Sequence, residues 1–184
     1  SFTSIAGATS PSYTTPALTV TNSGIAYRVL VYNTKNGAIS ASVTSSTAVI
    51  TVSAITLTTP TAPSLSAPAG TTTSMTVNYS SSQVLNTSVY SISLYRVSGD
   101  SLTATVQQSY TNSGLLTFTG LAANTAYYAK VIAIGSGNYD NSAASAASTS
   151  VSTNALPTAP VIATSPASTT ITSGNATDLS VSAT

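Results

Sequence analysis

Few residues of this chain have side chains that could carry out catalysis. The sequence has no histidine, cysteine or glutamate, and its acidic residues are Asp100, Asp140 and Asp178. General acid–base catalysis mostly uses histidine or a pair of carboxylates, and these aspartates are far apart in the sequence and fall in expected loops or turns. A serine nucleophile needs a neighbouring base, and neither Lys35 nor Lys130 belongs to a matching motif. We therefore expect no catalytic residue and no enzymatic activity.

The same scarcity argues against metal, cofactor and nucleic-acid sites. Zinc sites are built from histidine and cysteine and calcium sites from clustered carboxylates, so the sequence predicts no metal ligand and no cofactor. The cations are Arg28, Lys35, Arg96 and Lys130, and four scattered charges cannot neutralise the phosphates of a nucleic acid. No run of about 18 apolar residues is present that could span a membrane. We expect neither nucleic acid nor a membrane span in this segment.

Tyrosines are the remaining candidates for binding. The chain has 10 of them, and several fall at positions that a core would use. Tyr110, Tyr128 and Tyr139 do not, and together they could form an aromatic platform for a glycan. Surface tyrosine on a strand also reflects ordinary β-propensity, so both interpretations stay open at this point.

The overall composition indicates a folded β-protein. The apolar fraction is 42%, close to the globular norm of about 45–50%. The charged fraction is 4% against a usual value of about 25%, and serine and threonine make up more than a third of the chain. Disordered segments combine low hydrophobicity with high net charge, and neither holds here. Threonine and valine suit half-buried strands.

Apolar residues recur with the period of a strand along most of the chain. Runs over residues 26–31 and 48–52 flank Asn36-Gly37, which favours a β-hairpin because both turn residues tolerate positive φ; the loop is expected to be two residues or longer. Further runs lie at 75–79, 90–94, 116–121 and 127–133, with a weaker edge strand at 148–153. Lys130 is out of phase with Tyr127 and Val131, so it should point to the outer face.

A repeated tetrapeptide marks the ends of one module. Pro60-Thr61-Ala62-Pro63 recurs as Pro157-Thr158-Ala159-Pro160, and the interval matches the length of one sandwich domain, about 100 residues. Short strands with frequent turn signals between these marks are typical of a β-sandwich. The fold class expected is therefore all-β, with β-sandwiches in tandem.

The module between the repeats resembles fibronectin type III. Its strongest motif runs from Leu121 through Thr125 and Tyr127 to Val131 and Ala133, which matches the corner and following strand of that family. The resemblance places Tyr127 at the tyrosine-corner position, whose hydroxyl bonds to nearby backbone. It also places Tyr79 where the family usually has a core tryptophan.

The two ends of the chain resemble parts of bacterial immunoglobulin-like domains. The stretch from Ile5 to Leu18 is similar to one common in large bacterial secreted proteins, and Tyr27-Arg28-Val29 stands where antibody-type domains have Tyr-x-Cys. The resemblance puts Val29 and Val181 at the two half-cystine positions, as a packed hydrophobic pair. Tyr27, Val29, Tyr79, Leu121, Thr125, Tyr127, Val131 and Val181 are thus the expected markers of the core.

These resemblances imply a domain order and a role. Residues 1–54 would be the C-terminal half of an immunoglobulin-like sandwich, 55–156 a fibronectin type III-like sandwich with proline-rich linkers, and 157–184 the first strands of another immunoglobulin-like sandwich. Such modules occur in extracellular, cell-surface repeat proteins, so we expect a structural or adhesive part of a surface fibre or filament. Spacer modules of a secreted polysaccharide-degrading enzyme, or a phage fibre decoration, are the alternatives.

The partner expected from this order is a further copy of the same chain. The half-domains could be completed within a longer array, which we favour, or between copies, the C-terminal strands of one completing the N-terminal half of the next. A head-to-tail contact of that kind does not close and generates a fibre. Lateral pairing of strand edges is a second route to a homopolymer.

Overall fold

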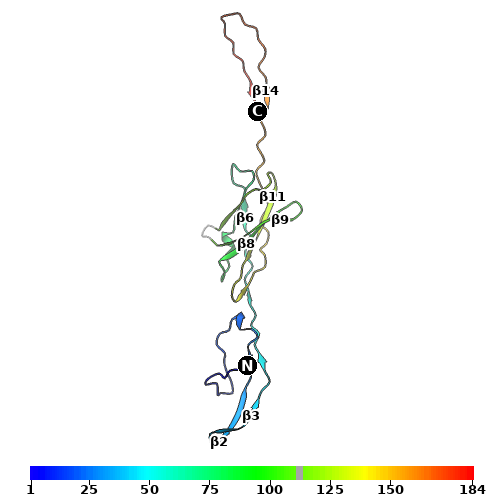
Figure 1. The fold of residues 1–184 in the computed structure, drawn as a ribbon. Helices are drawn as coiled ribbons and strands as arrows, with labels where there is room; N and C mark the ends of the chain where they lie inside the picture. The colour runs from blue at the N-terminus through cyan, green and yellow to red at the C-terminus, as the bar shows by residue number, and fades with distance from the viewer. Residues whose placement is uncertain (111–113) are drawn as a thin grey trace.

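The molecule is an elongated, all-β protein. The computed structural model describes residues 1–110 and 114–184, and the all-β fold class expected from the sequence is confirmed. In the described residues the helices are single 3-10 turns, η1 (Val20–Asn22) and η2 (Ser80–Ser82), and none is long and apolar enough to cross a membrane. An N-terminal hairpin and a C-terminal hairpin lie at opposite ends of the long axis, with a sandwich between them (Figure 1).

Two antiparallel sheets form the central sandwich. The smaller sheet has the order β10-β7-β6 and the larger the order β13-β11-β8-β9. The strands of the smaller sheet are β6 (Ser64–Ser66), β7 (Met75–Asn78) and β10 (Leu115–Phe118). Those of the larger are β8 (Val89–Arg96), β9 (Ser101–Ser109), β11 (Ala126–Ala133) and β13 (Val151–Ser152). Neighbours that are distant in sequence, such as β7 and β10, hold the sandwich together.

The core consists of the inward-facing residues of these strands. Alternate residues of a strand point to opposite faces, and every second residue of β11 is buried while those between are half-buried. Fully buried side chains come from both sheets: Met75, Val77, Tyr79, Ile92, Leu94, Ala129, Val131 and Ala133. No disulfide stabilises this core, because the chain has no cysteine.

A serine-rich ribbon covers one edge of the larger sheet. Ser142, Ser145 and Ser148 follow one another at intervals of three, and each gives its backbone N–H to one carbonyl of β11. Each serine Oγ also accepts the N–H of that same β11 residue, at 2.9–3.0 Å. The partners are Ala133, Val131 and Ala129, in that order. Each step of three residues along the ribbon therefore matches a step of two residues along β11, as in a series of β-bulges. The resulting edge is irregular and disfavours the addition of another strand.

The N-terminal segment forms narrow two-stranded sheets. Strand β1 (Ala26–Tyr27) pairs with β4 (Ala48–Val49), and β2 (Leu30–Lys35) pairs with β3 (Ala38–Thr44). Lys35 lies opposite Ala38, so the loop is the two residues Asn36 and Gly37, with φ of 55° and 79°. The expected hairpin is confirmed with its shortest loop. The run at 26–31 is broken at Val29, whose N–H bonds to Ser45 Oγ at 2.9 Å.

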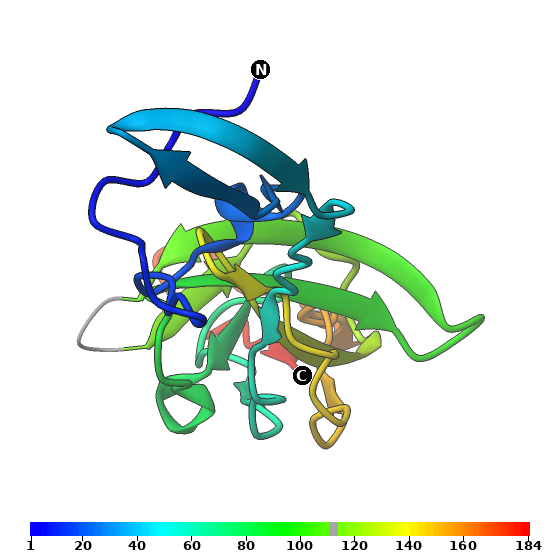
Figure 2. The same ribbon diagram turned by 90° about the horizontal axis from the view of Figure 1, so that it is seen from below.

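Hydrogen bonds connect this segment to the sandwich. Strand β5 (Ile55–Thr56) pairs in parallel with β12 (Tyr139–Asp140). In addition, the backbone N–H of Val20 donates to Asn138 Oδ1, at 3.0 Å. The loop after β11 therefore contacts two separate parts of the N-terminal region. Figure 2, seen from the end that carries this region, shows the blue N-terminal strands in front of the green strands of the sandwich.

The C-terminal segment is an extended hairpin. Strands β14 (Ile162–Thr164) and β15 (Ser182–Ala183) pair at its base, where Val161 and Thr184 exchange two backbone hydrogen bonds of 3.0 Å. A turn closes the hairpin, with the N–H of Asn175 donating to the carbonyl of Thr172 at 3.1 Å and Gly174 at φ 91°. All described residues of this segment are exposed.

Candidate functional site

The acidic residues of the described chain are dispersed. No cluster of three or more histidine, cysteine, aspartate or glutamate side chains occurs within 1–110 and 114–184. Asp100 is the last residue of the turn between β8 and β9, Asp140 belongs to β12, and Asp178 lies in the C-terminal hairpin. The aspartates thus lie in three different parts of the molecule, and this arrangement offers no paired carboxylates for acid–base chemistry.

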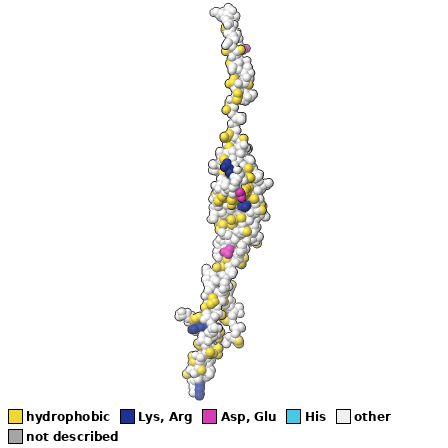
Figure 3. All heavy atoms as spheres, turned by 90° about the vertical axis from the view of Figure 1, so that its right-hand side faces the viewer, with side chains coloured by type: hydrophobic (Ala, Val, Ile, Leu, Met, Phe, Trp, Pro, Cys, Tyr) yellow, Lys and Arg dark blue, Asp and Glu magenta, His cyan; other side chains and the backbone are white. Residues whose placement is uncertain are grey.

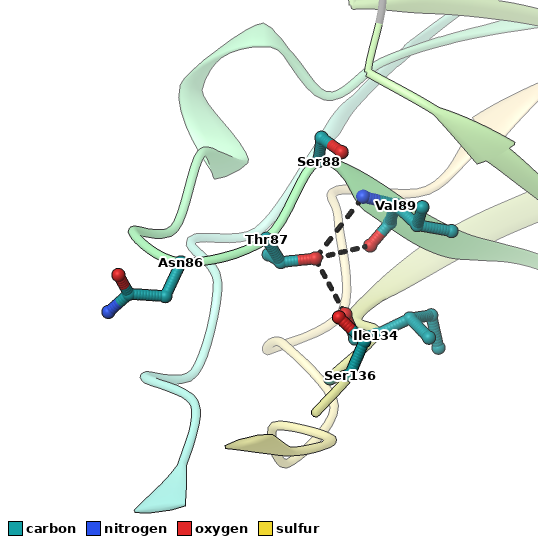
Figure 4. Close-up of a pocket in the computed structure, with 7 residues that line it drawn as sticks. Asn86, Thr87, Ser88, Val89, Ile134 and Ser136 are labelled. Carbon is teal, nitrogen blue, oxygen red and sulfur yellow. Dashed lines mark hydrogen bonds between the residues drawn. The ribbon is translucent and has the colours of Figure 1, made fainter. Parts of the chain in front are cut away.

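A shallow pocket lies where the loop before β8 meets the end of β11. It is lined by Asn86, Thr87, Ser88, Val89, Ile134, Gly135 and Ser136. The Thr87 hydroxyl donates to the carbonyl of Ile134 at 2.6 Å and lies 3.2 Å from the N–H of Val89. In Figure 4 the Asn86 side chain points away from these groups. The Thr87 hydroxyl at the centre of this pocket therefore connects the start of β8 to the residue that follows β11 by hydrogen bonds.

An aromatic and charged cluster lies on the outer face of the larger sheet. Tyr95 and Tyr128 are directly opposite in the register of β8 and β11, and their rings stack at 5.0 Å with an interplanar angle of 4°. The Lys130 ammonium is 5.6 and 5.7 Å from the two ring centres, which places Lys130 on the outer face, as predicted. The Tyr128 hydroxyl donates to Asp100. That hydrogen bond, with smaller contributions from desolvation and nearby charge, raises the pKa of Tyr128 to about 12.

The three tyrosines considered for a glycan platform are not brought together. Tyr110 packs against Tyr79 with its ring edge-on at 5.8 Å, and Tyr139 also packs against the core. Tyr128 faces outward and pairs with Tyr95, which was not among the candidate binding residues. Strand register decides that pairing, and no local signal around residue 95 reveals it.

The markers within the sandwich occupy its interior. Tyr79 and Val131 are fully buried, and Leu121 and Tyr127 are nearly so. The Tyr127 hydroxyl accepts the backbone N–H of Ala122 at 3.2 Å. Thr125 is half-buried, and its N–H and carbonyl both bond to Thr153. Tyr127 and Thr125 therefore hold the chain around the turn that precedes β11.

The markers at the two ends behave differently. Val29 and Val181 are 60% and 57% exposed, and they lie in the two segments at opposite ends of the molecule. Within the described residues they therefore do not pack on each other in one copy, and a packed pair formed with further chain or with a second copy stays a prediction. Tyr27 is half-buried, with its ring centre 6.2 Å from that of Tyr13.

Exposed apolar strands are the most unusual surface feature of the molecule. Large apolar side chains of the N-terminal segment that are more than half exposed include Val29, Leu30, Val31, Tyr32, Ile39, Val43 and Val49. Those of the C-terminal segment are Val161, Ile162, Leu179 and Val181. Apolar atoms reach the surface in both end regions in Figure 3, where charged side chains are few. So many exposed large apolar side chains on two short segments make both segments candidate interaction sites.

No protein-family model matches the chain, and no curated protein matches it. Among solved structures, a computer-redesigned β-sandwich protein is 21% identical, with a TM-score of 0.43 over 54% of this chain and 93% of that one. The FN1–FN3 domains of chicken CNTN1 are 22% identical, with a TM-score of 0.43 over 72% of this chain and 43% of that one.

A segment of two fibronectin type III domains from chicken tenascin is 17% identical, with a TM-score of 0.40 over 71% of this chain and 66% of that one. These proteins are of the sandwich class expected from the sequence. With TM-scores below 0.5 they add no argument, so the fold assignment rests on the sheet topology described above.

Proposed function

We propose that this chain is a non-catalytic structural module of an extracellular surface fibre or filament, and that its partners are further copies of itself. The observation that supports this proposal is the pair of exposed apolar strand segments at opposite ends of an elongated molecule. A surface of that kind at each end favours association along the long axis. The central sandwich then acts as a rigid spacer between successive contacts.

The charge distribution is compatible with close packing of copies. The formal net charge is +1, so two copies repel one another weakly. Hydroxyl side chains cover much of the remaining surface and keep it hydrated. The serine ribbon protects one edge of the larger sheet, which disfavours uncontrolled lateral pairing on that side.

Electron microscopy of the purified full chain tests this function. We expect regular fibres whose axial repeat is no longer than one copy, and shorter where the ends of successive copies overlap. Light scattering should show that their mass grows with protein concentration, because association follows mass action. Monodisperse single particles at all concentrations would contradict the proposal and favour a spacer within a larger secreted protein.

A further inference from the structure

Three large aliphatic side chains are exposed on one face of the N-terminal hairpin and at its edge. Val31 lies opposite Val43 in the β2–β3 register, so these two share one side of the hairpin, and Val29 lies in the break just before β2. They are 59–66% exposed. We call Val29, Val31 and Val43 the N-terminal face. Within the described residues no second sheet packs on it.

A matching face lies on the C-terminal hairpin. Ile162 is opposite Ala183 in the register, and Leu179 and Val181 lie in the arm of the hairpin that leads into β15. Ile162, Leu179 and Val181 are therefore large apolar side chains carried by the two paired arms of this hairpin. They are 57–64% exposed. We call these three residues the C-terminal face.

Each of these hairpins needs a partner. An isolated two-stranded hairpin is marginally stable in water, and a third strand or a covering layer supplies the missing burial. The two faces cannot cover each other within one copy, because the sandwich separates them along the long axis (Figure 1). A second copy offers the complementary face at the correct end.

Charge favours the same pairing. The formal charges of residues 1–54 are the cations Arg28 and Lys35, whereas that of residues 157–184 is the anion Asp178. Contact between an N-terminal and a C-terminal segment therefore joins opposite charges. Contact between two N-terminal segments would instead bring like charges together, which costs energy.

We propose that the C-terminal face of one copy packs on the N-terminal face of the next, so that the two hairpins form a shared two-layer unit. This inference rests on the proposed fibre function and specifies its joint. The contact uses different surfaces on the two partners, so it does not close and extends into a filament. Lateral pairing through the exposed edge strand β9 is the competing arrangement.

Single aspartate substitutions test the joint. Val31→Asp alters the N-terminal face and Leu179→Asp the C-terminal face, and a buried unpaired carboxylate at either position should weaken self-association about 100-fold. Leu85→Asp is the matched control, because Leu85 is 85% exposed and belongs to neither face. Leu102→Asp tests β9. Thermal unfolding of the sandwich should be the same for all four variants, which shows that each one folds.

Mixing the two face variants separates this joint from other contacts. Val31→Asp keeps an intact C-terminal face and Leu179→Asp an intact N-terminal face, so each alone should stay monomeric and the mixture should form a 1:1 dimer that does not grow. Sedimentation measures these masses. Fibres from both face variants, or loss of fibres in Leu102→Asp alone, would overturn the inference and leave the fibre function standing. A monomeric wild-type chain would overturn both.

Discussion

Replacing Ser145 by alanine removes the two hydrogen bonds of its hydroxyl, and only one of them has a buried partner. Ser145 Oγ accepts the N–H of Val131 at 3.0 Å, while its backbone N–H donates to the Val131 carbonyl at 2.8 Å. Alanine keeps the backbone bond and loses the acceptor. The hydroxyl also donates to the carbonyl of Ala146, but Ala146 is exposed and its carbonyl can bond to water.

The expected cost follows from the burial of the donor. Val131 is fully buried and Ser145 is 4% exposed, so the orphaned N–H cannot reach water without local opening of the ribbon. A buried unsatisfied donor costs about 1–3 kcal/mol, and we expect Ser145→Ala to lower the free energy of unfolding by about 2 kcal/mol. For a sandwich of this size that corresponds to a decrease in Tm of about 8–16 °C.

Guanidinium unfolding followed by tyrosine fluorescence measures this loss, since the chain has no tryptophan. The control is Ser150→Ala, because Ser150 is in the same part of the chain and is exposed; it should change stability by less than about 0.5 kcal/mol. The m value should be unchanged. If Ser145→Ala costs no more than Ser150→Ala, the Oγ acceptors do not stabilise the edge and the reasoning is refuted.

Two further predictions concern tyrosine hydroxyls. Tyr127→Phe removes the acceptor of the Ala122 N–H and should cost about 0.5–1.5 kcal/mol in the same unfolding assay; a loss no larger than that of Tyr32→Phe, at an exposed site, would contradict it. The pKa of Tyr128 is raised from 10.0 to about 12, so the hydrogen bond to Asp100 stabilises the folded protein fully below pH 10 and is lost as the pH rises through about 12. Ultraviolet titration of the phenol should show Asp100→Asn moving this pKa back toward its ordinary value, and an unchanged titration would exclude Asp100 as the cause.

Much of the sandwich follows from local pattern. The alternation over residues 127–133 predicts which side of β11 faces the core, and Tyr127 and Val131 are buried while Lys130 is not fully so. Asn36-Gly37 predicts its hairpin because the two residues tolerate the positive φ that the turn requires. The buried side of β11 and the Asn36-Gly37 turn both depend on residues close together in the chain, so the sequence alone predicts them.

Features that depend on pairing follow less completely from the pattern. The run at 148–153 is predicted to be an edge strand, and β13 (Val151–Ser152) is an edge strand of the larger sheet, but it is short, since Ser148 belongs to the serine ribbon along β11. The three-residue spacing of Ser142, Ser145 and Ser148 is a visible signal of this ribbon. Strand β9 was not expected, since its polar residues weaken the alternation.

The sequence by itself determined the all-β class, the inward and outward faces of the main strands, and the scarcity of groups for catalysis. Tertiary structure alone decided that Tyr95 stacks on Tyr128, because strand register joins residues distant in sequence. It also decided that Val29 and Val181 stay exposed at separate ends. An apolar residue at strand period indicates that a face will be buried, but burial needs a second layer, and that layer lies outside the local pattern.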